Sequence, residues 1–542
     1  MKNVRILDCT LRDGGRVINC EFPDKEIQEM TGRLTEAGID VVEIGFIRDQ
    51  RVIDYRGNST FFTDVEQIIP FLPNDRKNTI FTAFVDFGMY DIDSLKEYNG
   101  KSVDAIRFGF TKKDFDEERE EVIRWANVIK QKGYRLFIQG VNSLNYSDAE
   151  LLGLIQMVNE IHPYSFGIVD TYGAMYMDDV DRLYGLINRN MSHDICVNFH
   201  SHNNYQLSFA FAQEIVKISE NTNRNVIIDG TLGGMGKVAG NLNTELITEF
   251  LVRKKYYNYD IDSIFDLIDE YIYKYEKKCK WGYSVPGLMA GIHKSHPNNV
   301  IYLTEKFSLQ SKDIGRILSM IDEESRQRYN YDEIERLYIE YTSSKIIDRD
   351  SVEQLRKAFV RRDVMILVPG NSLNTEKRRI DNYISDNDVV VISVNFVDER
   401  DGVIAFFGNE RAYKKRHLRG KDRKIIITSN IKSESANDII VDYSGLINRG
   451  YKYFENSTLM LLNLLDKVGV SSIIFAGFDG FNYEKETNYN DPSFQNDRYV
   501  DRFGEMNAEI KKMFDEYMLR VQDKCNISFL TPSIFDNKFS EG

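Results

Sequence analysis

The chain has 542 residues, more than one ordinary hydrophobic core supports, so we expect two or three domains. Hydrophobic residues make up 42% and charged residues 28%, as in water-soluble globular proteins, and the net charge of −14 argues against general binding to nucleic acid or to an anionic membrane. The five cysteines form no CxxC pair, so neither a disulfide framework nor a structural zinc site is indicated. We find no signal peptide and no long apolar run, which predicts a cytoplasmic protein.

Short apolar runs alternate with amphipathic stretches in the first half of the chain. Eight runs are candidate strands: Val4–Leu7, Val41–Ile44, Ile80–Val85, Ala105–Phe108, Leu136–Ile138, Phe166–Val169, Ile195–Phe199 and Val226–Ile228. Helical stretches such as Asp24–Ala37 and Glu118–Gln131 lie between them and stop at Gly38 and Gly133. Eight such units in about 250 residues predict a (β/α)8 TIM barrel, with a doubly wound open sheet as the alternative.

Polar side chains occur where six of these strands end, which is the face where such barrels carry out chemistry. They are Asp8, Arg12 and Asp13 after the first strand, Glu43 in the second, Arg107 in the fourth, Gln139 and Asn142 after the fifth, Asp170 and Thr171 after the sixth, and His200 and His202 in the seventh. Among them, we expect Arg107, Gln139, Asp170 and Thr171 to contact a substrate.

His200 and His202 are two residues apart, so on an extended strand both imidazoles point to one face. An isolated His-x-His pair is more often a polar strand end than a metal site, but Asp13 adds a carboxylate to the pair. Two imidazoles and one carboxylate form a site that leaves positions open for substrate. We expect Mn²⁺ or Mg²⁺, with Zn²⁺ as the alternative. Arg12 is a fork-shaped donor suited to a carboxylate or an enolate oxygen.

Four separated motifs resemble the DRE-TIM metallolyase superfamily: LDCTLRDGG at 7–15, Glu43, the pair His200 and His202, and GGMGKVAGN at 233–241. This superfamily includes 4-hydroxy-2-oxovalerate aldolases, hydroxymethylglutaryl-CoA lyases, isopropylmalate synthases and pyruvate carboxyltransferase domains. The resemblance covers about residues 1–300. It implies a TIM barrel in which Asp13, His200 and His202 bind the metal, with Asn241 as a further ligand. It also implies that Arg12 stabilises a pyruvate-like enolate, while Glu43 supports these groups from behind.

The chain departs from this family at the position of the proton-transfer residue. The aldolases carry a catalytic histidine shortly after the RDG motif, whereas Arg16 stands there in this chain and cannot act as a base at neutral pH. The glycine-rich loop at 230–241 also lacks the cysteine of hydroxymethylglutaryl-CoA lyase. Candidates for a replacement relay are Tyr283, His293 and His296, although each would more commonly be a surface or packing residue.

The rest of the chain divides into two predicted regions. Residues 256–355 look mostly helical, and we expect them to cover the mouth of the barrel formed by residues 1–255. From residue 364 to 542, a second series of apolar runs predicts an open, mostly parallel Rossmann-like sheet. Its candidate strands begin at Val364 and continue at Val389–Val394, Ile425–Thr428, Ile439–Val441 and Ser472–Ala476.

Short motifs in this second region resemble bacterial sialyltransferase-like and motility-accessory-factor-like domains. They are PGNSL at 369–373, SVNF at 393–396, FFGNE at 406–410 and AGFDGF at 476–481. The resemblance implies a nucleotide or nucleotide-sugar at Gly370, Asn371, Ser372 and Asn395. A turn leading into a helix N-terminus can hold a phosphate. The alternative is a turn that only caps the helix and binds no ligand.

Together these features predict a metal-dependent aldolase or lyase that makes or breaks a carbon–carbon bond next to a 2-oxo acid. The second region suggests surface-polysaccharide or unusual-sugar biosynthesis. The alternatives are a Claisen-type acyl-CoA lyase or synthase on the same barrel, and a non-catalytic scaffold or carbohydrate-binding protein. We expect a homo-oligomer with a small-molecule 2-oxo acid substrate and no nucleic-acid or membrane partner.

Overall fold

A computed structural model describes residues 3–255, 257–304, 309, 311–342, 346–359, 361–415, 424–484, 487–494, 500 and 502–536. The chain forms two compact units. The first contains residues 1–305 and 311–330, and the second contains residues 306–310 and 331–542. Within the described ranges, no helix is both long and apolar enough to cross a membrane.

The first unit contains a closed barrel of eight parallel strands. They are β1 (Val4–Asp8), β2 (Val41–Ile47), β4 (Ile80–Asp86), β5 (Ala105–Phe110), β6 (Arg135–Gly140), β7 (Ser165–Asp170), β8 (Cys196–Ser201) and β9 (Val226–Gly230). Their order is β1-β9-β8-β7-β6-β5-β4-β2, and pairing of β1 with β2 closes the ring. A short strand, β3 (Phe61–Phe62), pairs in parallel with the carboxyl end of β2. The predicted TIM barrel is confirmed, and the closing pair excludes the open-sheet alternative.

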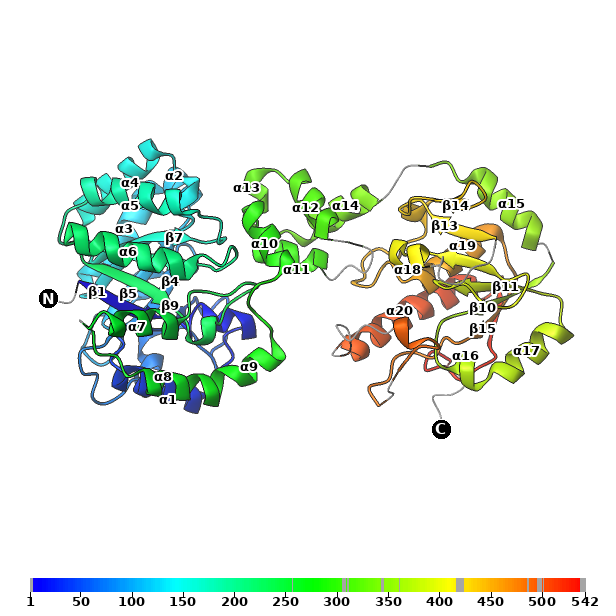
Figure 1. Cartoon of the computed structure of the whole chain (residues 1–542), viewed down its shortest axis with the longest axis horizontal. Coiled ribbons are helices and arrows are strands. Elements are labelled where there is room, and N and C mark those ends of the chain that lie inside the picture. Colours follow the sequence, from blue (N-terminus) through cyan, green and yellow to red (C-terminus); the bar gives the residue numbers. More distant parts are fainter. Residues whose placement is uncertain are drawn as a thin grey trace. The chain divides into compact units, whose positions relative to one another are not determined.

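Helices pack around the outside of the barrel strands (Figure 1). They are α1 (Asp24–Glu36), α2 (Lys112–Glu117), α3 (Arg119–Gln131), α4 (Asp148–Ile161), α5 (Met177–Asn190), α6 (Ser208–Thr222), α7 (Thr244–Arg253) and α8 (Ile261–Leu267). Their apolar faces are buried, as in α3, where Val122, Trp125 and Ile129 lie one turn apart on the inner side. Because both faces of each strand are covered, the strands are nearly continuous apolar runs, which made them recognisable in the sequence.

The helices after residue 272 divide between the two units. In the first unit are α9 (Tyr273–Lys278), α10 (Val285–Ile292), α11 (Pro297–Thr304), α12 (Ser311–Met320) and α13 (Glu323–Arg326); in the second are α14 (Tyr331–Thr342) and α15 (Arg349–Phe359). The segment around α10 packs on the loops that follow β8 and β9. The Trp281 indole donates to the Gly233 carbonyl at 2.9 Å, and the Asn204 amide donates to the Gly287 carbonyl at 2.8 Å. This segment therefore lies at the carboxyl ends of the barrel strands.

The second unit contains a parallel sheet of seven strands with helices around it (Figure 1). The strands are β10 (Asp363–Leu367), β11 (Val389–Val394), β12 (Ile404–Phe407), β13 (Ile425–Thr428), β14 (Ile439–Val441), β15 (Ser472–Ala476) and β16 (Asn526–Phe529). The helices are α16 (Ser372–Thr375), α17 (Lys377–Asp386), α18 (Glu410–Lys415), α19 (Ser457–Val468) and α20 (Phe503–Val521). The order β14-β13-β12-β11-β10-β15-β16 reverses direction between β10 and β15, where open parallel sheets commonly bind ligands.

Candidate functional site

The three predicted metal ligands converge at the carboxyl end of the barrel. Asp13 lies in the turn after β1, where its backbone N–H donates to the Cys9 carbonyl. His200 lies in β8, and His202 follows the end of that strand. The Asp13 Oδ2 atom lies 4.0 Å from His200 Nε2 and 3.7 Å from His202 Nε2. Ligand atoms of the three residues all lie within 4.8 Å of one another. One ion can therefore reach a carboxylate oxygen and two imidazole nitrogens together.

Asn241 shows that this group of residues fits a cation. It pairs with His202 in an isolated antiparallel bridge, and its Nδ2 atom donates to Asp13 Oδ2 and to the Met235 carbonyl, both at 3.0 Å. Its Oδ1 atom is buried and has no hydrogen-bond partner among the described residues. A buried acceptor without a partner is costly, and a divalent cation is a natural partner for it here. The donor set of carboxylate, amide oxygen and two imidazoles suits Mn²⁺ and similar ions.

Asp229 fixes the orientation of His200. The Asp229 Oδ2 atom lies 3.0 Å from His200 Nδ1. Burial raises the pKa of Asp229, but the Arg107 charge and the bond from His200 outweigh it and hold this pKa below its ordinary value. An ionised carboxylate only accepts, so His200 donates from Nδ1 and its Nε2 lone pair is available to a metal. Asp229 was not predicted from the sequence, although an acidic residue within the apolar run VIIDG is a usable signal.

Asp13 and His202 are both in the protonation state that metal ligands need. Burial raises the pKa of Asp13, but Arg12, His202 and His200 hold it well below its ordinary value. Burial lowers the pKa of His202 to about 4, although Asp13 opposes that shift. At neutral pH the site therefore offers a carboxylate and an uncharged imidazole.

Arg12 is held rigidly beside the metal ligands. Its Nε atom donates to Glu43 Oε2 at 2.6 Å, and its Nη1 atom donates to Asp13 Oδ1 at 2.7 Å. The guanidinium also lies over the Phe84 ring, 4.6 Å from its centre. Burial lowers the pKa of Arg12, but the Glu43 and Asp13 carboxylates outweigh it and raise this pKa above its ordinary value. Arg12 is thus a permanent, oriented positive charge, and Glu43 acts by positioning it.

Arg107 and Gln139 do not lie where a substrate contact was predicted. Arg107 is 1% exposed, and its guanidinium donates to Glu43, Asn198 and Asp229. Gln139 donates from Nε2 to Asn198 Oδ1 at 2.7 Å. Both side chains belong to a buried network that supports the metal ligands from inside the barrel, so a positioning role replaces the predicted contact.

Asp170 and Thr171 shape the loops at the end of β7. The two carboxylate oxygens of Asp170 accept the backbone N–H groups of Ala174 and Met175 at 2.8 and 3.2 Å. Burial raises the pKa of Asp170 to about 7. The Thr171 hydroxyl oxygen accepts the Asn142 N–H at 2.9 Å. These bonds give both residues a role in the loop structure, and a substrate contact by either stays a prediction.

The three relay candidates have different surroundings. Tyr283 is 61% exposed, and its role as a relay stays a prediction. His293 follows α10 at its C-cap position and is half-buried. His296 is connected to Lys237 through Asn298, which accepts from Lys237 Nζ and donates its backbone N–H to His296 Nδ1. Burial, and then the positive charges of Lys237 and Arg16, lower the pKa of His296 to about 4. The structure therefore brings only His296 of the three to the residue that replaces the family's base. Lys237, a lone basic residue in the glycine-rich loop, was not singled out from the sequence.

The predicted phosphate position in the second sheet is already filled by a side chain of the chain itself. Asp479, which follows β15, accepts the Ser372 backbone N–H at 2.8 Å and also the Ser372 hydroxyl. The N–H groups of Gly370 and Leu373 donate to backbone carbonyls. The prediction of open backbone donors here is therefore wrong for these three residues. Asn371 follows Gly370 in the same turn, and nucleotide binding elsewhere at this sheet edge stays a prediction.

Asn395 has a structural function in the second sheet. It follows β11 with a φ of 60°, and its Oδ1 atom accepts the Gly408 N–H at 3.2 Å. Asparagine tolerates this left-handed conformation better than most residues. Its side-chain carbonyl thus connects the ends of β11 and β12, which leaves the amide nitrogen for any ligand contact.

Residues 3–269 match the HMGL-like family model. Oxaloacetate decarboxylase of Mycobacterium tuberculosis is 26% identical over 267 residues, which cover 48% of this chain and 74% of that protein. A 4-hydroxy-2-oxovalerate aldolase of Carboxydothermus hydrogenoformans is 23% identical over 325 residues, 58% of this chain and 90% of that protein. A solved N-terminal domain of a candidate aldolase from Bacteroides vulgatus is 24% identical with a TM-score of 0.48, covering 56% of this chain and 97% of that one.

These matches support placing the barrel in the DRE-TIM superfamily. By their names, these two relatives are a decarboxylase and an aldolase that act on 2-oxo acids.

Proposed function

We propose that the barrel is a divalent-metal-dependent carbon–carbon lyase that breaks or forms a bond next to a 2-oxo acid through a pyruvate-type enolate. The observation that carries this proposal is the convergence of Asp13, His200 and His202 within 4.8 Å of one another, beside the unpartnered Asn241 Oδ1. The names of the relatives, an oxaloacetate decarboxylase and a 4-hydroxy-2-oxovalerate aldolase, support it, because both reactions release pyruvate as its enolate.

Asp13, His200, His202 and Asn241 would hold the metal, with Mn²⁺ or Mg²⁺ ahead of Zn²⁺. A bound divalent ion supplies Lewis acidity that polarises the 2-oxo carbonyl. Asp229 keeps His200 oriented for this task through its bond to Nδ1. The neutral state of His202 at pH 7 means that no proton has to be displaced from it on binding.

Arg12 would stabilise the negative charge that develops on the enolate oxygen. Two of its nitrogens are committed to Glu43 and Asp13, which leaves Nη2 as the guanidinium nitrogen outside these two bonds. Because the charge is fixed before the reaction, no reorganisation is needed when the enolate forms. Glu43 and Arg107, which share an ion pair at 3.2 Å, keep this arrangement in place.

The proton balance distinguishes two reactions of this class. In aldol cleavage of a 4-hydroxy-2-oxo acid, the C3–C4 bond breaks, its electron pair forms the enolate, and the 4-hydroxyl proton must pass to a base. In decarboxylation of a 2-oxo diacid, the bond to the carboxylate breaks and CO₂ leaves, so no base is required. Both reactions end with protonation of C3.

One observation favours decarboxylation as the second candidate. Arg16 stands where the aldolases of this superfamily place a base, and His296 has a pKa of about 4 because of burial and nearby positive charge. Neither residue takes up a proton efficiently at neutral pH. A reaction that needs no proton acceptor at this point fits these residues directly.

The test is production of pyruvate from 4-hydroxy-2-oxopentanoate and from oxaloacetate with Mn²⁺ or Mg²⁺ present. We expect metal-dependent release that EDTA abolishes, above the rate with an Asp13→Asn variant, which controls for spontaneous metal-catalysed decay. Release that requires an acyl-CoA would instead indicate the Claisen-type alternative. No turnover of any 2-oxo acid by the metal-loaded protein would reject the proposal.

A further inference from the structure

Three basic side chains of the first unit come from segments next to the candidate metal ligands. Arg16 lies in the short 3₁₀ helix at Gly14–Ile18, Lys237 lies in the loop after β9, and His296 lies between α10 and α11. The positive charges of Lys237 and Arg16 both act on His296, and the charge of Arg16 acts on Lys237. Residues far apart in the sequence thus form one basic group.

Asn298 connects two members of this group. Lys237 Nζ donates to Asn298 Oδ1 at 3.2 Å, and the Asn298 backbone N–H donates to His296 Nδ1 at 3.1 Å. Because Nδ1 accepts, the neutral His296 ring carries its proton on Nε2. Lys237 and His296 are therefore both hydrogen-bond donors at this place, and Arg16 adds a third.

Among the described residues, Asp13 is the one carboxylate that forms an ion pair with this group, through Arg16. Within the part of the chain that the structure describes, no carboxylate oxygen lies within 4 Å of Lys237 Nζ. Arg16 lies 3.9 Å from Asp13 Oδ1, an atom that already accepts from Arg12 at 2.7 Å. Burial, followed by the charge of Arg16, lowers the pKa of Lys237. Partly buried charges are normally paired, so excess positive charge favours binding of an anion.

The glycine-rich loop joins this basic group to the metal ligands. Lys237 and Asn241 lie four residues apart in it, and Gly240 has a φ of +76° that other residues rarely adopt. A Cβ atom on Gly236 would lie 2.5 Å from Asn241 Nδ2. The close approach of Gly236 to Asn241 fixes the conformation of the loop, and the charge of Asp13 acts on Lys237. An anion bound by Lys237 can belong to the same molecule that occupies the metal site.

We infer that Arg16, Lys237 and His296 bind a second anionic group, a carboxylate or a phosphate, of a 2-oxo acid whose oxo-acid end lies at the metal ligands. This inference rests on the proposed function and deepens it, because it restricts the substrate to dianionic 2-oxo acids. In this arrangement Arg16 is a specificity-determining residue, which binds the second anionic group at the position where the related aldolases carry a base.

The experiment compares two ligands that differ mainly in the distal anion and undergo neither proposed reaction. They are 2-oxoglutarate and 2-oxopentanoate, titrated calorimetrically into the full-length protein with Mn²⁺ bound. A phosphonate analogue, 2-oxo-4-phosphonobutanoate, distinguishes a phosphate-type partner from a carboxylate. We expect a dianion to bind about 10- to 100-fold more tightly than 2-oxopentanoate, the gain expected from charge-assisted hydrogen bonds.

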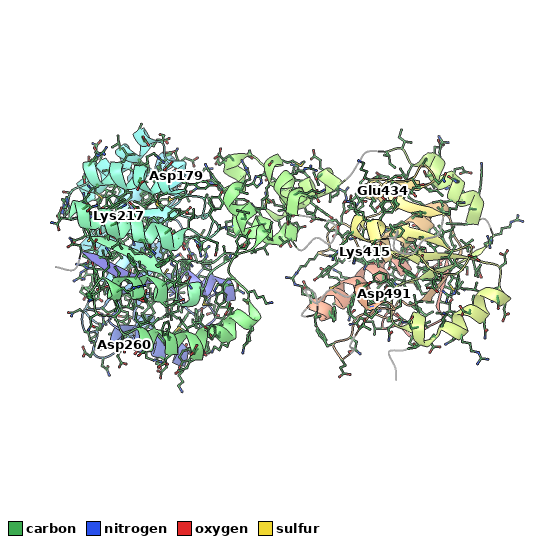
Figure 2. All side chains as sticks on the ribbon, viewed as in Figure 1. Asp179, Lys217, Asp260, Lys415, Glu434 and Asp491 are labelled. Carbon is green, nitrogen blue, oxygen red and sulfur yellow. The ribbon has the colours of Figure 1, made fainter. Side chains whose placement is uncertain are left out.

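Lys237→Met should abolish most of this preference and leave the affinity for 2-oxopentanoate within about 3-fold, because only the distal contact is lost. Lys237→Arg, which keeps the charge, should restore a large part of it, and this rescue separates anion binding from a merely structural role. Lys217→Met is the matched control, since Lys217 lies on the outer surface of α6, pairs only locally with Glu214, and is labelled in Figure 2.

The outcomes separate this inference from the proposed function. Equal binding of the dianions and 2-oxopentanoate, or no binding of any of them, would overturn the inference even if the enzyme releases pyruvate. An equal loss for all ligands in Lys237→Met would also overturn it. A dianion preference that depends on Lys237, found in a protein that turns over no 2-oxo acid, would support the anion site and reject the lyase.

Discussion

The polar groups at the carboxyl edges of the two parallel sheets differ in whether the chain itself satisfies their hydrogen bonds. At the barrel edge, ligand atoms of Asp13, His200 and His202 lie within 4.8 Å of one another, and the buried Asn241 Oδ1 has no partner among the described residues. At the edge of the second sheet, Asp479 reaches across from β15 and bonds both donors of Ser372. The first edge thus leaves a buried acceptor without a partner, whereas the Ser372 donors of the second edge are satisfied by Asp479, next to a cavity that Gly370 and Asp479 line.

This difference shows that a sequence motif at a strand end does not by itself identify a ligand site. Both edges carry turn-forming, polar sequences after buried strands, and general rules place ligand sites at both. Only the pairing of each polar atom decides whether a foreign group can bind. An unpartnered buried acceptor indicates binding, while a satisfied donor indicates structure.

The largest effect should come from removing the charge of the metal site. Asp13→Asn keeps the shape of the side chain but removes the carboxylate that Arg12 and the metal require, so we expect metal affinity and turnover to fall by about 10³-fold or more. His202→Ala should behave similarly. Metal content after dialysis and steady-state rates would measure this, with His193→Ala as control, since His193 is exposed before β8. If the Asp13→Asn variant retained its metal, Asp13 would not be a metal ligand, and the contrast between the two sheet edges would no longer hold.

Arg12→Lys should give the next largest effect. Lysine keeps the charge but cannot bond Glu43 and Asp13 at once while facing the enolate, so we expect kcat to fall by about 10²- to 10³-fold. Metal affinity should change little, because Arg12 is not a ligand. Rates and calorimetric metal titrations on the same preparation would check both parts. Unchanged turnover would take Arg12 out of the mechanism.

Asp229→Asn tests the support of His200. Asp229 accepts through both oxygens, whereas an amide has one acceptor oxygen, so either His200 or Asn198 must face an NH₂ group and Arg107 loses an ion partner. Changes to groups that orient metal ligands commonly cost about 10- to 100-fold in metal affinity. Competition against a fluorescent chelator would measure the change. An affinity within 2-fold of the parent protein would mean that His200 is held by packing alone.

The smallest effect is expected at the second sheet. Asp479→Ala leaves the Ser372 N–H without its acceptor, so we expect a loss of about 1–3 kcal/mol in the free energy of unfolding. It should also open the turn to small anions, so that millimolar phosphate restores part of the melting temperature. Glu484→Ala, an exposed change a few residues away, is the control. If phosphate raises the melting temperature of the parent protein as much as that of the Asp479→Ala variant, Asp479 does not block anion binding at this edge of the second sheet.

The sequence predicted the strands well because strands buried on both faces are written as apolar runs. It missed β12 and β16 in the second sheet. The run IAFF of β12 overlaps a stretch that was interpreted as a nucleotide motif, and β16 is a partly exposed edge strand with the alternating sequence NISF. Edge strands bury only part of their side chains, so their apolar signal is weak.

The sequence by itself determined the barrel and predicted that Asp13, His200 and His202 lie together at its carboxyl end, because a strand period of two and the position of strand ends are local properties. Metal binding by these three residues stays a prediction. Only the tertiary structure decided which polar groups face a ligand. Arg107 is three residues into β5 and therefore points into the network with Glu43 and Asp229, well before the strand ends. The meeting of Lys237 with His296 likewise depends on how α10 and α11 pack on the barrel loops, since partners 59 residues apart leave no local pattern.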